Sequence, residues 1–100
     1  MDVGFKTSRL RECYEDEDEG TREWGAKIAR QYIARVNLLH AVRNAQDLRS
    51  FKALHFHALE GARDGQYAVR LDDAWRLIVS FDDKGMTIVR VEAVSKHYGD

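Results

Sequence analysis

A histidine and two arginines in the second half of the chain have side chains suited to phosphate chemistry. They are His57, Arg70 and Arg76, within the stretch FHALEGARDGQYAVRLDDAWRLIVSF at residues 56–81. A histidine can serve as a general acid or base near neutral pH, and the planar fork of an arginine pairs with phosphate oxygens. The alternative is that the arginines are solvated strand positions that protect a sheet edge, and that the histidine caps a loop. The pattern alone fits both interpretations.

Two further candidates lie in the C-terminal stretch SKHYGD. His97 could exchange a proton, and Tyr98 could donate a proton or stack on a base. The alternative is that this stretch is a frayed tail.

The histidines at positions 55 and 57 raise the question of a metal site. In an extended segment, His55 and His57 would lie on one side, and Asp64 or Cys13 could add a further ligand. No third ligand stands at a spacing typical of metal sites, so we expect neither a metal nor another cofactor. Cys13 is better explained as a buried thiol within a helix.

Composition limits the classes of protein that the chain can belong to. A chain of 100 residues with 44% apolar and 33% charged residues is typical of one globular domain, so we expect a single domain over residues 1–100. Residues 1–50 hold nine Lys/Arg and nine Asp/Glu, and residues 51–100 hold seven Lys/Arg and eight Asp/Glu, so neither half is a basic nucleic-acid-binding arm. Any polyanion must therefore be bound by a local group of arginines. No run approaches the roughly 20 apolar residues of a membrane helix, and no signal core is seen. We therefore expect a cytoplasmic protein.

The first half of the chain has the pattern of helices. DVGF at residues 2–5 could form a short edge strand, and a helix is expected over about residues 8–16, with Ser8 as its N-cap and Gly20 as its C-cap. The acidic run at residues 15–19 would then lie at the end of this helix, where positive charge is preferred. A second helix is expected over residues 21–44, capped by Thr21. Its apolar residues recur every three or four positions, which predicts one buried face: Trp24, Ile28, Tyr32, Val36 and Leu39.

The second half changes to the period of two that is typical of strands. Residues 67–71 and 75–81 alternate around Asp72-Asp73, which predicts a hairpin. A second turn follows in which Gly85 would adopt a positive φ, and residues 86–94 form a third strand, expected to be the central one. The predicted fold class is α+β, with two helices on one face of an antiparallel sheet that is largely this three-stranded meander. Arg70 and Arg76 would then lie across the hairpin, on the open face.

The stretch FHALEGARDGQYAVRLDDAWRLIVSFDD resembles the HigB-type, or plasmid killer, branch of the RelE/ParE toxin superfamily. The matching positions are His57, Leu59, Gly61, Tyr67, Val69, Arg70, Trp75, Arg76, Leu77 and Phe81. The resemblance implies a RelE-like fold and the toxin of a type II toxin–antitoxin pair. Such toxins enter the ribosomal A site and cleave mRNA there without a metal, using the 2′-hydroxyl of the RNA as the nucleophile.

The resemblance also implies roles for the candidate residues. His57 would be an acid/base or orienting residue, and Arg70 and Arg76 would hold the scissile phosphate. His97 or Tyr98, which match the polar end of the family pattern, would complete proton transfer or stack on the codon. The implied partner is a HigA-like antitoxin with a helix-turn-helix, so the chain would reach DNA only through the toxin–antitoxin complex.

Two other functions remain open for a chain of this family. One is a ParE-like protein that poisons DNA gyrase without cleaving nucleic acid. The other is a binding or regulatory module that keeps the fold and has lost activity. The second is favoured by Glu60, where the family pattern has a lysine, and by the sequence pI of about 6.4, since HigB-like toxins are usually basic.

Overall fold

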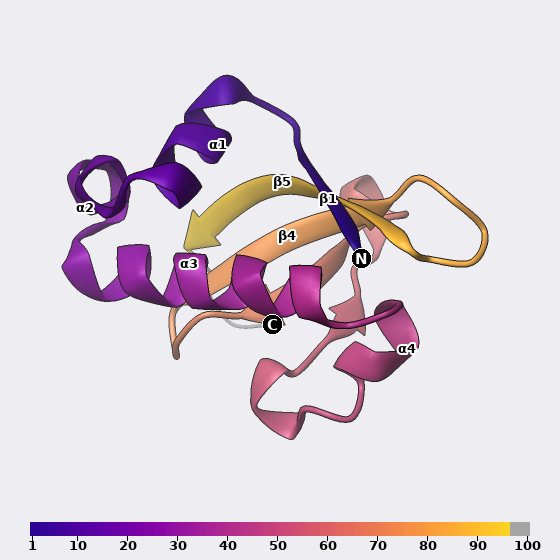
Figure 1. The fold of residues 1–100 in the computed structure, drawn as a ribbon. Coiled ribbons are helices and arrows are strands. Elements are labelled where there is room, and N and C mark those ends of the chain that lie inside the picture. Colours follow the sequence, from indigo (N-terminus) through magenta and orange to yellow (C-terminus); the bar gives the residue numbers. More distant parts are fainter. Residues whose placement is uncertain (97–100) are drawn as a thin grey trace.

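The α-helices lie in the first half of the chain, and four of the five strands lie in the second half. This arrangement is seen in a computed structural model, in which residues 1–96 are described (Figure 1). The elements in chain order are β1 (Asp2–Phe5), α1 (Ser8–Glu15), α2 (Glu17–Trp24), α3 (Ala26–Ala41), α4 (Ala45–Leu48), the 3₁₀ turn η1 (Lys52–Leu54), β2 (His57–Ala58), the 3₁₀ turn η2 (Gly61–Arg63), β3 (Tyr67–Arg70), β4 (Trp75–Phe81) and β5 (Ile88–Lys96). The predicted α+β class is confirmed.

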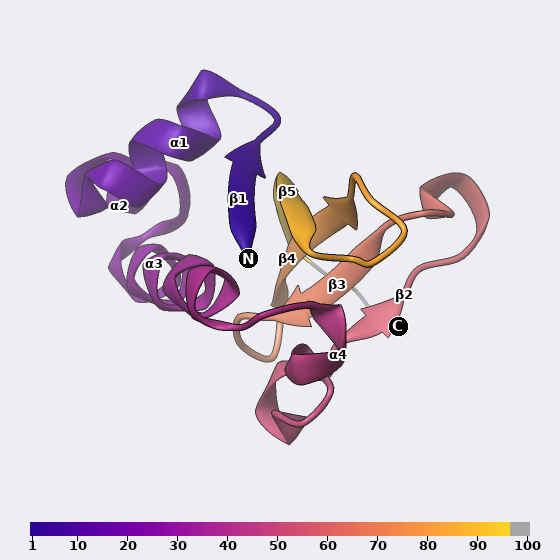
Figure 2. The ribbon, with the colours of Figure 1, turned by 45° about the vertical axis from the view of Figure 1, so that its right-hand side comes forward.

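The strands form a single five-stranded sheet in the order β1-β5-β4-β3-β2. Strand β1 runs parallel to β5, and the other neighbours are antiparallel, so the predicted meander β3-β4-β5 makes up the middle of the sheet. Figure 2 shows α1, α2 and α3 gathered to one side of this sheet. Among residues 1–96, no helix is both long enough and apolar enough to cross a lipid bilayer.

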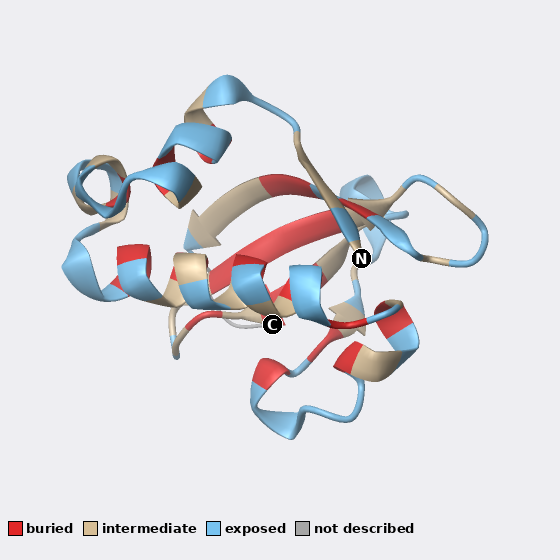
Figure 3. Cartoon of the chain, in the orientation of Figure 1, coloured by how far each residue is buried: buried red, intermediate tan, exposed pale blue. Residues whose placement is uncertain are grey.

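The core lies between the apolar face of α3 and the apolar face of the sheet. Leu77 and Val79 of β4 are fully buried, and they belong to the same apolar cluster as Tyr32 and Val36 of α3. Figure 3 shows this buried band running along β4. The predicted apolar stripe is therefore confirmed from Ile28 to Leu39 as the face of α3 that covers the sheet, whereas Trp24 lies at the end of α2 and is partly buried. Residues that alternate with the core positions of β4 face the other way, and we call that side the open face.

The helix predicted over residues 21–44 is in fact two helices. The chain breaks at Gly25, whose φ of +85° lies in the region that glycine adopts without a steric penalty. Thr21 is therefore not an N-cap, because it lies inside α2 and its hydroxyl donates to the Glu17 carbonyl. Glycine often ends a helix in this way, so Gly25 is the sequence signal for the break.

The predicted caps of the first helix were also wrong. Thr7 rather than Ser8 caps α1, because its Oγ1 accepts a hydrogen bond from the Leu10 N–H at 3.1 Å. Gly20 does not end α1 but lies buried inside α2, where an added Cβ would come within 3.1 Å of the Ala29 Cβ. The acidic run opens α2 instead, since negative charge is stabilised at a helix N-terminus and Asp16 caps it.

Two predictions about the strands need correction, and one is confirmed. Strand β4, not β5, is the central strand of the five. Gly85 does not have a positive φ; Met86 does, at 55°. The hairpin turn at Asp72-Asp73 is confirmed, and Asp72 Oδ1 accepts the N–H groups of Ala74 and Trp75 at 2.8 Å each.

A bulge in β5 buries one carboxylate. The register shifts between Ile78 and Val79, which leaves Glu92 as an extra residue. Its side chain is 5% exposed, and its Oε2 accepts hydrogen bonds from Ser80 Oγ at 2.7 Å and Arg90 Nε at 2.6 Å. Burial raises the pKa of this carboxyl, but these hydrogen bonds and the nearby positive charges more than offset it, so the pKa lies below its ordinary value.

We expect Glu92→Gln to lower the free energy of unfolding at pH 7 by about 1.5–3 kcal/mol, the range for hydrogen bonds to charged groups. Because the folded-state pKa is depressed, this stability is present above the ordinary glutamate pKa and is lost as the pH falls through the folded value. Chemical denaturation at pH 7 and pH 3.5 measures it, with the exposed Glu15→Gln as control. The wild-type and Glu92→Gln stabilities should converge in acid, and an equal gap at both pH values would contradict the assignment.

Candidate functional site

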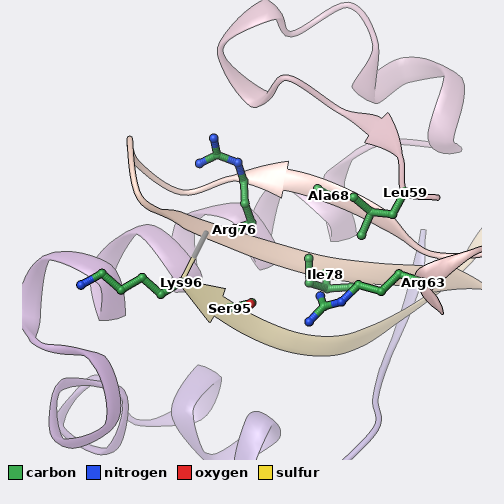
Figure 4. A pocket seen from close by; sticks show the side chains of 7 residues that line it. All are labelled: Leu59, Arg63, Ala68, Arg76, Ile78, Ser95 and Lys96. Atoms are coloured by element: carbon green, nitrogen blue, oxygen red, sulfur yellow. The ribbon is translucent and has the colours of Figure 1, made fainter. Parts of the chain in front are cut away.

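The open face of the sheet carries a hollow of about 290 Å³ at the end where β4 begins and β5 ends. We call it the open-face hollow, and its lining residues are Leu59, Arg63, Ala68, Arg76, Ile78, Ser95 and Lys96 (Figure 4). Ala68 and Ile78 form an apolar floor and are 1% and 3% exposed. Three of the seven residues are cationic and none is a carboxylate, so within residues 1–96 the lining favours an anion.

Strand register places the floor and the walls of this hollow. Ile78 pairs with Ala68 on one side and with Ala93 on the other, and Arg76 pairs with Ser95, so these residues form adjacent rows on one face. Strand pairing therefore fixes the floor of the hollow and the position of Arg76 beside it.

Arg63 comes from the loop between β2 and β3. Gly61 and Gly65 both have positive φ values, 66° and 88°, which allow the loop to turn tightly through η2. The Leu59 N–H donates to the Gln66 carbonyl at 2.9 Å, which closes the loop. In Figure 4 the Arg63 side chain extends along the floor beside Ile78, whereas Lys96 points outward. Sequence reasoning missed Arg63 and Lys96 as site residues, although the two glycines flanking Arg63 were a signal for a tight loop.

Arg76 is the most constrained cation of the open-face hollow. The residue is 8% exposed, and its Nη1 donates to the carbonyls of Asp72 at 2.6 Å and Trp75 at 3.1 Å. The alternative of a solvated strand position is therefore wrong for Arg76. Its anchorage on the hairpin turn fixes the direction of its guanidinium before any ligand arrives.

Arg70 is the cross-strand partner of Arg76, as the hairpin pattern predicted. Its guanidinium, however, forms an ion pair with Asp73 and lines a different hollow, beside α3. The structure thus places the two arginines opposite each other in the sheet but does not bring their guanidinium groups into one hollow.

His57 lies on the same face as the floor of the open-face hollow. It pairs with Ala68, which pairs with Ile78, so His57 is two strands from β4, a separation of about 10 Å between strand axes. Its Nδ1 is 2.7 Å from the His55 carbonyl oxygen. A carbonyl only accepts hydrogen bonds, so Nδ1 carries the proton and Nε2 is the basic nitrogen of the neutral ring.

The remaining candidates from the sequence are the two C-terminal residues, the possible metal ligands and Cys13. His97 and Tyr98 lie outside the described residues 1–96. The His55 and His57 rings are 4.6 Å apart between centroids, but across residues 1–96 no three His, Cys, Asp or Glu side chains gather into a group that could hold a metal ion. Cys13 is buried, and desolvation raises the pKa of its thiol, which keeps it protonated and unreactive.

Comparison with known families defines the class of protein to which this fold and site belong. Residues 3–93 match the family of HigB-like toxins, described as the RelE-like toxin of the type II toxin–antitoxin system HigB. The chain belongs to this HigB-like toxin family. The resemblance identified from the sequence is therefore confirmed.

Solved structures give the same fold at low sequence identity. YafQ from E. coli strain BL21(DE3) is 16% identical with a TM-score of 0.64, over 95% of this chain and 91% of that one. The YoeB/ParE toxin from Agrobacterium tumefaciens is 16% identical with a TM-score of 0.58, over 98% and 100% of the two chains. A chain of the YoeB-YefM complex from Staphylococcus aureus is 16% identical with a TM-score of 0.61, over 98% of each chain. No curated protein matches the sequence.

Proposed function

We propose that the chain is a toxin that cleaves translated mRNA in the ribosomal A site, without a metal, by attack of the RNA 2′-hydroxyl. The observation that carries the proposal is the open-face hollow, whose described lining contains an apolar floor and three cations, Arg63, Arg76 and Lys96, and no carboxylate. Such a hollow suits a phosphodiester, because arginine forks pair with its oxygens and no negative charge repels it. HigB-type toxins, which the chain resembles, act in this way.

The proposed reaction transfers the phosphodiester to the adjacent 2′-oxygen. A base removes the proton of the 2′-hydroxyl, the 2′-oxygen bonds to phosphorus, and the bond from phosphorus to the 5′-oxygen breaks as that oxygen gains a proton. The products are a 2′,3′-cyclic phosphate and a 5′-hydroxyl. DNA lacks the nucleophile, so the proposal predicts that it is not cut.

The candidate residues have different roles in this reaction. His57 is the proposed base, since its Nδ1–H is held by a carbonyl and its Nε2 is the basic nitrogen. Arg76, anchored on the turn, and Arg63 stabilise the negative charge that grows on the phosphoryl oxygens. His97 or Tyr98 remains the proposed donor of the proton to the leaving 5′-oxygen. Arg70 is assigned to the outer part of the RNA-binding surface, since its guanidinium lies in the neighbouring hollow.

The proposed partner is a HigA-like helix-turn-helix antitoxin, with action in the cytoplasm on the ribosome and its mRNA. The family supports a toxin–antitoxin pair, and the YoeB-YefM structures are described as toxin–antitoxin complexes. Glu60, which stands where the family pattern has a lysine, is exposed and does not line the open-face hollow. Its carboxylate is therefore kept off the proposed phosphate position, which weakens the case for an inactive module.

Brief induction in a bacterial host, with the 5′ ends of all transcripts mapped, tests the proposal. We expect growth arrest within minutes and new 5′-hydroxyl ends inside translated codons, at the same reading-frame position in many genes. With purified components, the protein should cut the same transcripts only while ribosomes translate them, because the proposed cleavage requires translation. Arrest with DNA-damage signals and no new ends would identify a gyrase poison, and absence of both effects would identify a binding module.

A further inference from the structure

A second hollow, of about 440 Å³, lies between α3, η1 and the β3–β4 turn. We call it the turn-side hollow, and its lining residues are Lys27, Gln31, Arg35, Ala53, Arg70, Leu71, Asp72 and Asp73. None of these residues has a step in the proposed cleavage reaction, and only Arg70 also borders the proposed RNA-binding surface. The lining of the turn-side hollow contains two carboxylates, whereas the described lining of the open-face hollow contains none. This difference indicates a different ligand.

Among the charged residues that line the turn-side hollow, Arg35 forms no ion pair with a carboxylate of the described residues. It is partly buried on α3, and its Nε donates to the Arg70 carbonyl at 3.0 Å. Within residues 1–96 no carboxylate lies within ion-pair distance of its guanidinium, and burial lowers the pKa of the group. A partly desolvated cation with no anion is costly, so an external carboxylate or phosphate would be favourable there.

The other charges of the turn-side hollow are already paired. Lys27 Nζ lies 3.7 Å from Asp72 Oδ2, and Arg70 forms an ion pair with Asp73. The hollow therefore holds three cations and two carboxylates, together with an amide and two apolar side chains, Ala53 and Leu71. A nucleic-acid backbone repeats its negative charge and would meet both aspartates at short range. A peptide can offer one carboxylate, backbone amides and apolar groups, which matches this lining.

We propose that the turn-side hollow binds a carboxylate-bearing segment of the protein that neutralises this toxin; this inference rests on the proposed function. An Asp or Glu of that segment pairs with the Nη donors of Arg35, and Gln31 hydrogen-bonds its backbone. Asp73, whose side chain is 95% exposed, accepts an N–H or a cation of the same segment. Arg70 connects the two hollows, because its carbonyl holds Arg35 and its cross-strand partner is Arg76. The partner therefore binds one strand away from the proposed phosphate position without filling it.

Arg35→Gln tests the proposal, with Arg30→Gln as the matched control, since Arg30 is exposed on the same helix and lines neither hollow. The probe is the product of the co-encoded gene that lifts the growth arrest, titrated calorimetrically against each purified variant. We expect Arg35→Gln to weaken binding at least tenfold, with mRNA cleavage within threefold of wild type, and Arg30→Gln to change neither. Thermal melting checks that Arg35→Gln is folded. If it is not folded, Lys27→Glu replaces it in the same binding and cleavage measurements, because the Lys27 side chain is 72% exposed and its replacement should not disturb the core.

The other outcomes overturn the proposal in distinguishable ways. If a folded Arg35→Gln binds the partner as tightly as wild type, the proposed carboxylate site is refuted and the toxin function is not affected. The same holds for Lys27→Glu where that variant is used. Loss of cleavage with partner affinity retained would assign the turn-side hollow to RNA. If wild-type induction causes no arrest, or no co-encoded product relieves it, the toxin function fails first and this inference fails with it.

Discussion

Replacing Arg76 with lysine is expected to reduce cleavage of translated mRNA by about 10²- to 10³-fold, the range for losing one donor that stabilises transition-state charge. Lysine keeps the positive charge but loses the planar fork that reaches two phosphoryl oxygens at once. The measurement is the rate at which purified protein cuts mRNA on ribosomes with a defined A-site codon. Thermal melting of the same preparation reports whether Arg76→Lys has kept the fold.

Lysine is the better replacement because Arg76 is nearly buried and holds the hairpin turn through two carbonyls. Arg76→Ala would remove these hydrogen bonds and leave a gap, so lost activity could reflect lost stability. Arg30→Lys is the control for the exchange of arginine for lysine, since Arg30 is exposed on α3. A folded Arg76→Lys that cleaves at more than a third of the wild-type rate would refute the assignment of Arg76 to the phosphate.

Local patterns predicted most of the fold, because they reflect which face of an element is buried. The apolar stripe of α3 and the alternation along β4 both reappear as the two sides of the core. The break at Gly25 was missed because helical periodicity continues across it, from Trp24 to Ile28, while only one backbone angle changes. The acidic run was assigned to the end of one helix, although the same charges are favourable at the start of the next.

The candidate site was predicted less completely, because it depends on where long side chains end. The hairpin placed Arg70 opposite Arg76 in the sheet. The Arg70 guanidinium, however, forms an ion pair with the neighbouring Asp73, and Arg70 lines the turn-side hollow. Arg63 lies in a loop without periodicity, and only the tight turn through η2 places it on the open face. Neither outcome follows from alternation along a strand.

Replacing His57 with glutamine is expected to slow cleavage by about 10²-fold or more, the contribution of a positioned general base. Glutamine can still hydrogen-bond, but it cannot accept the proton of the 2′-hydroxyl. Binding should persist, because the cations of the open-face hollow are unchanged. The measurements are the cleavage rate on programmed ribosomes and the affinity for ribosomes carrying an mRNA with a 2′-deoxy substitution at the cleavage position, which cannot react.

His55→Asn is the matched control for His57. The His55 ring lies 4.6 Å from the His57 ring between centroids, but it is the backbone carbonyl of His55 that accepts from His57 Nδ1. Asparagine tolerates the left-handed φ of 44° at position 55, so this carbonyl should stay in place and cleavage should remain near the wild-type rate. A rate for His57→Gln within a few-fold of wild type would give His57 an orienting role and would leave the base unassigned.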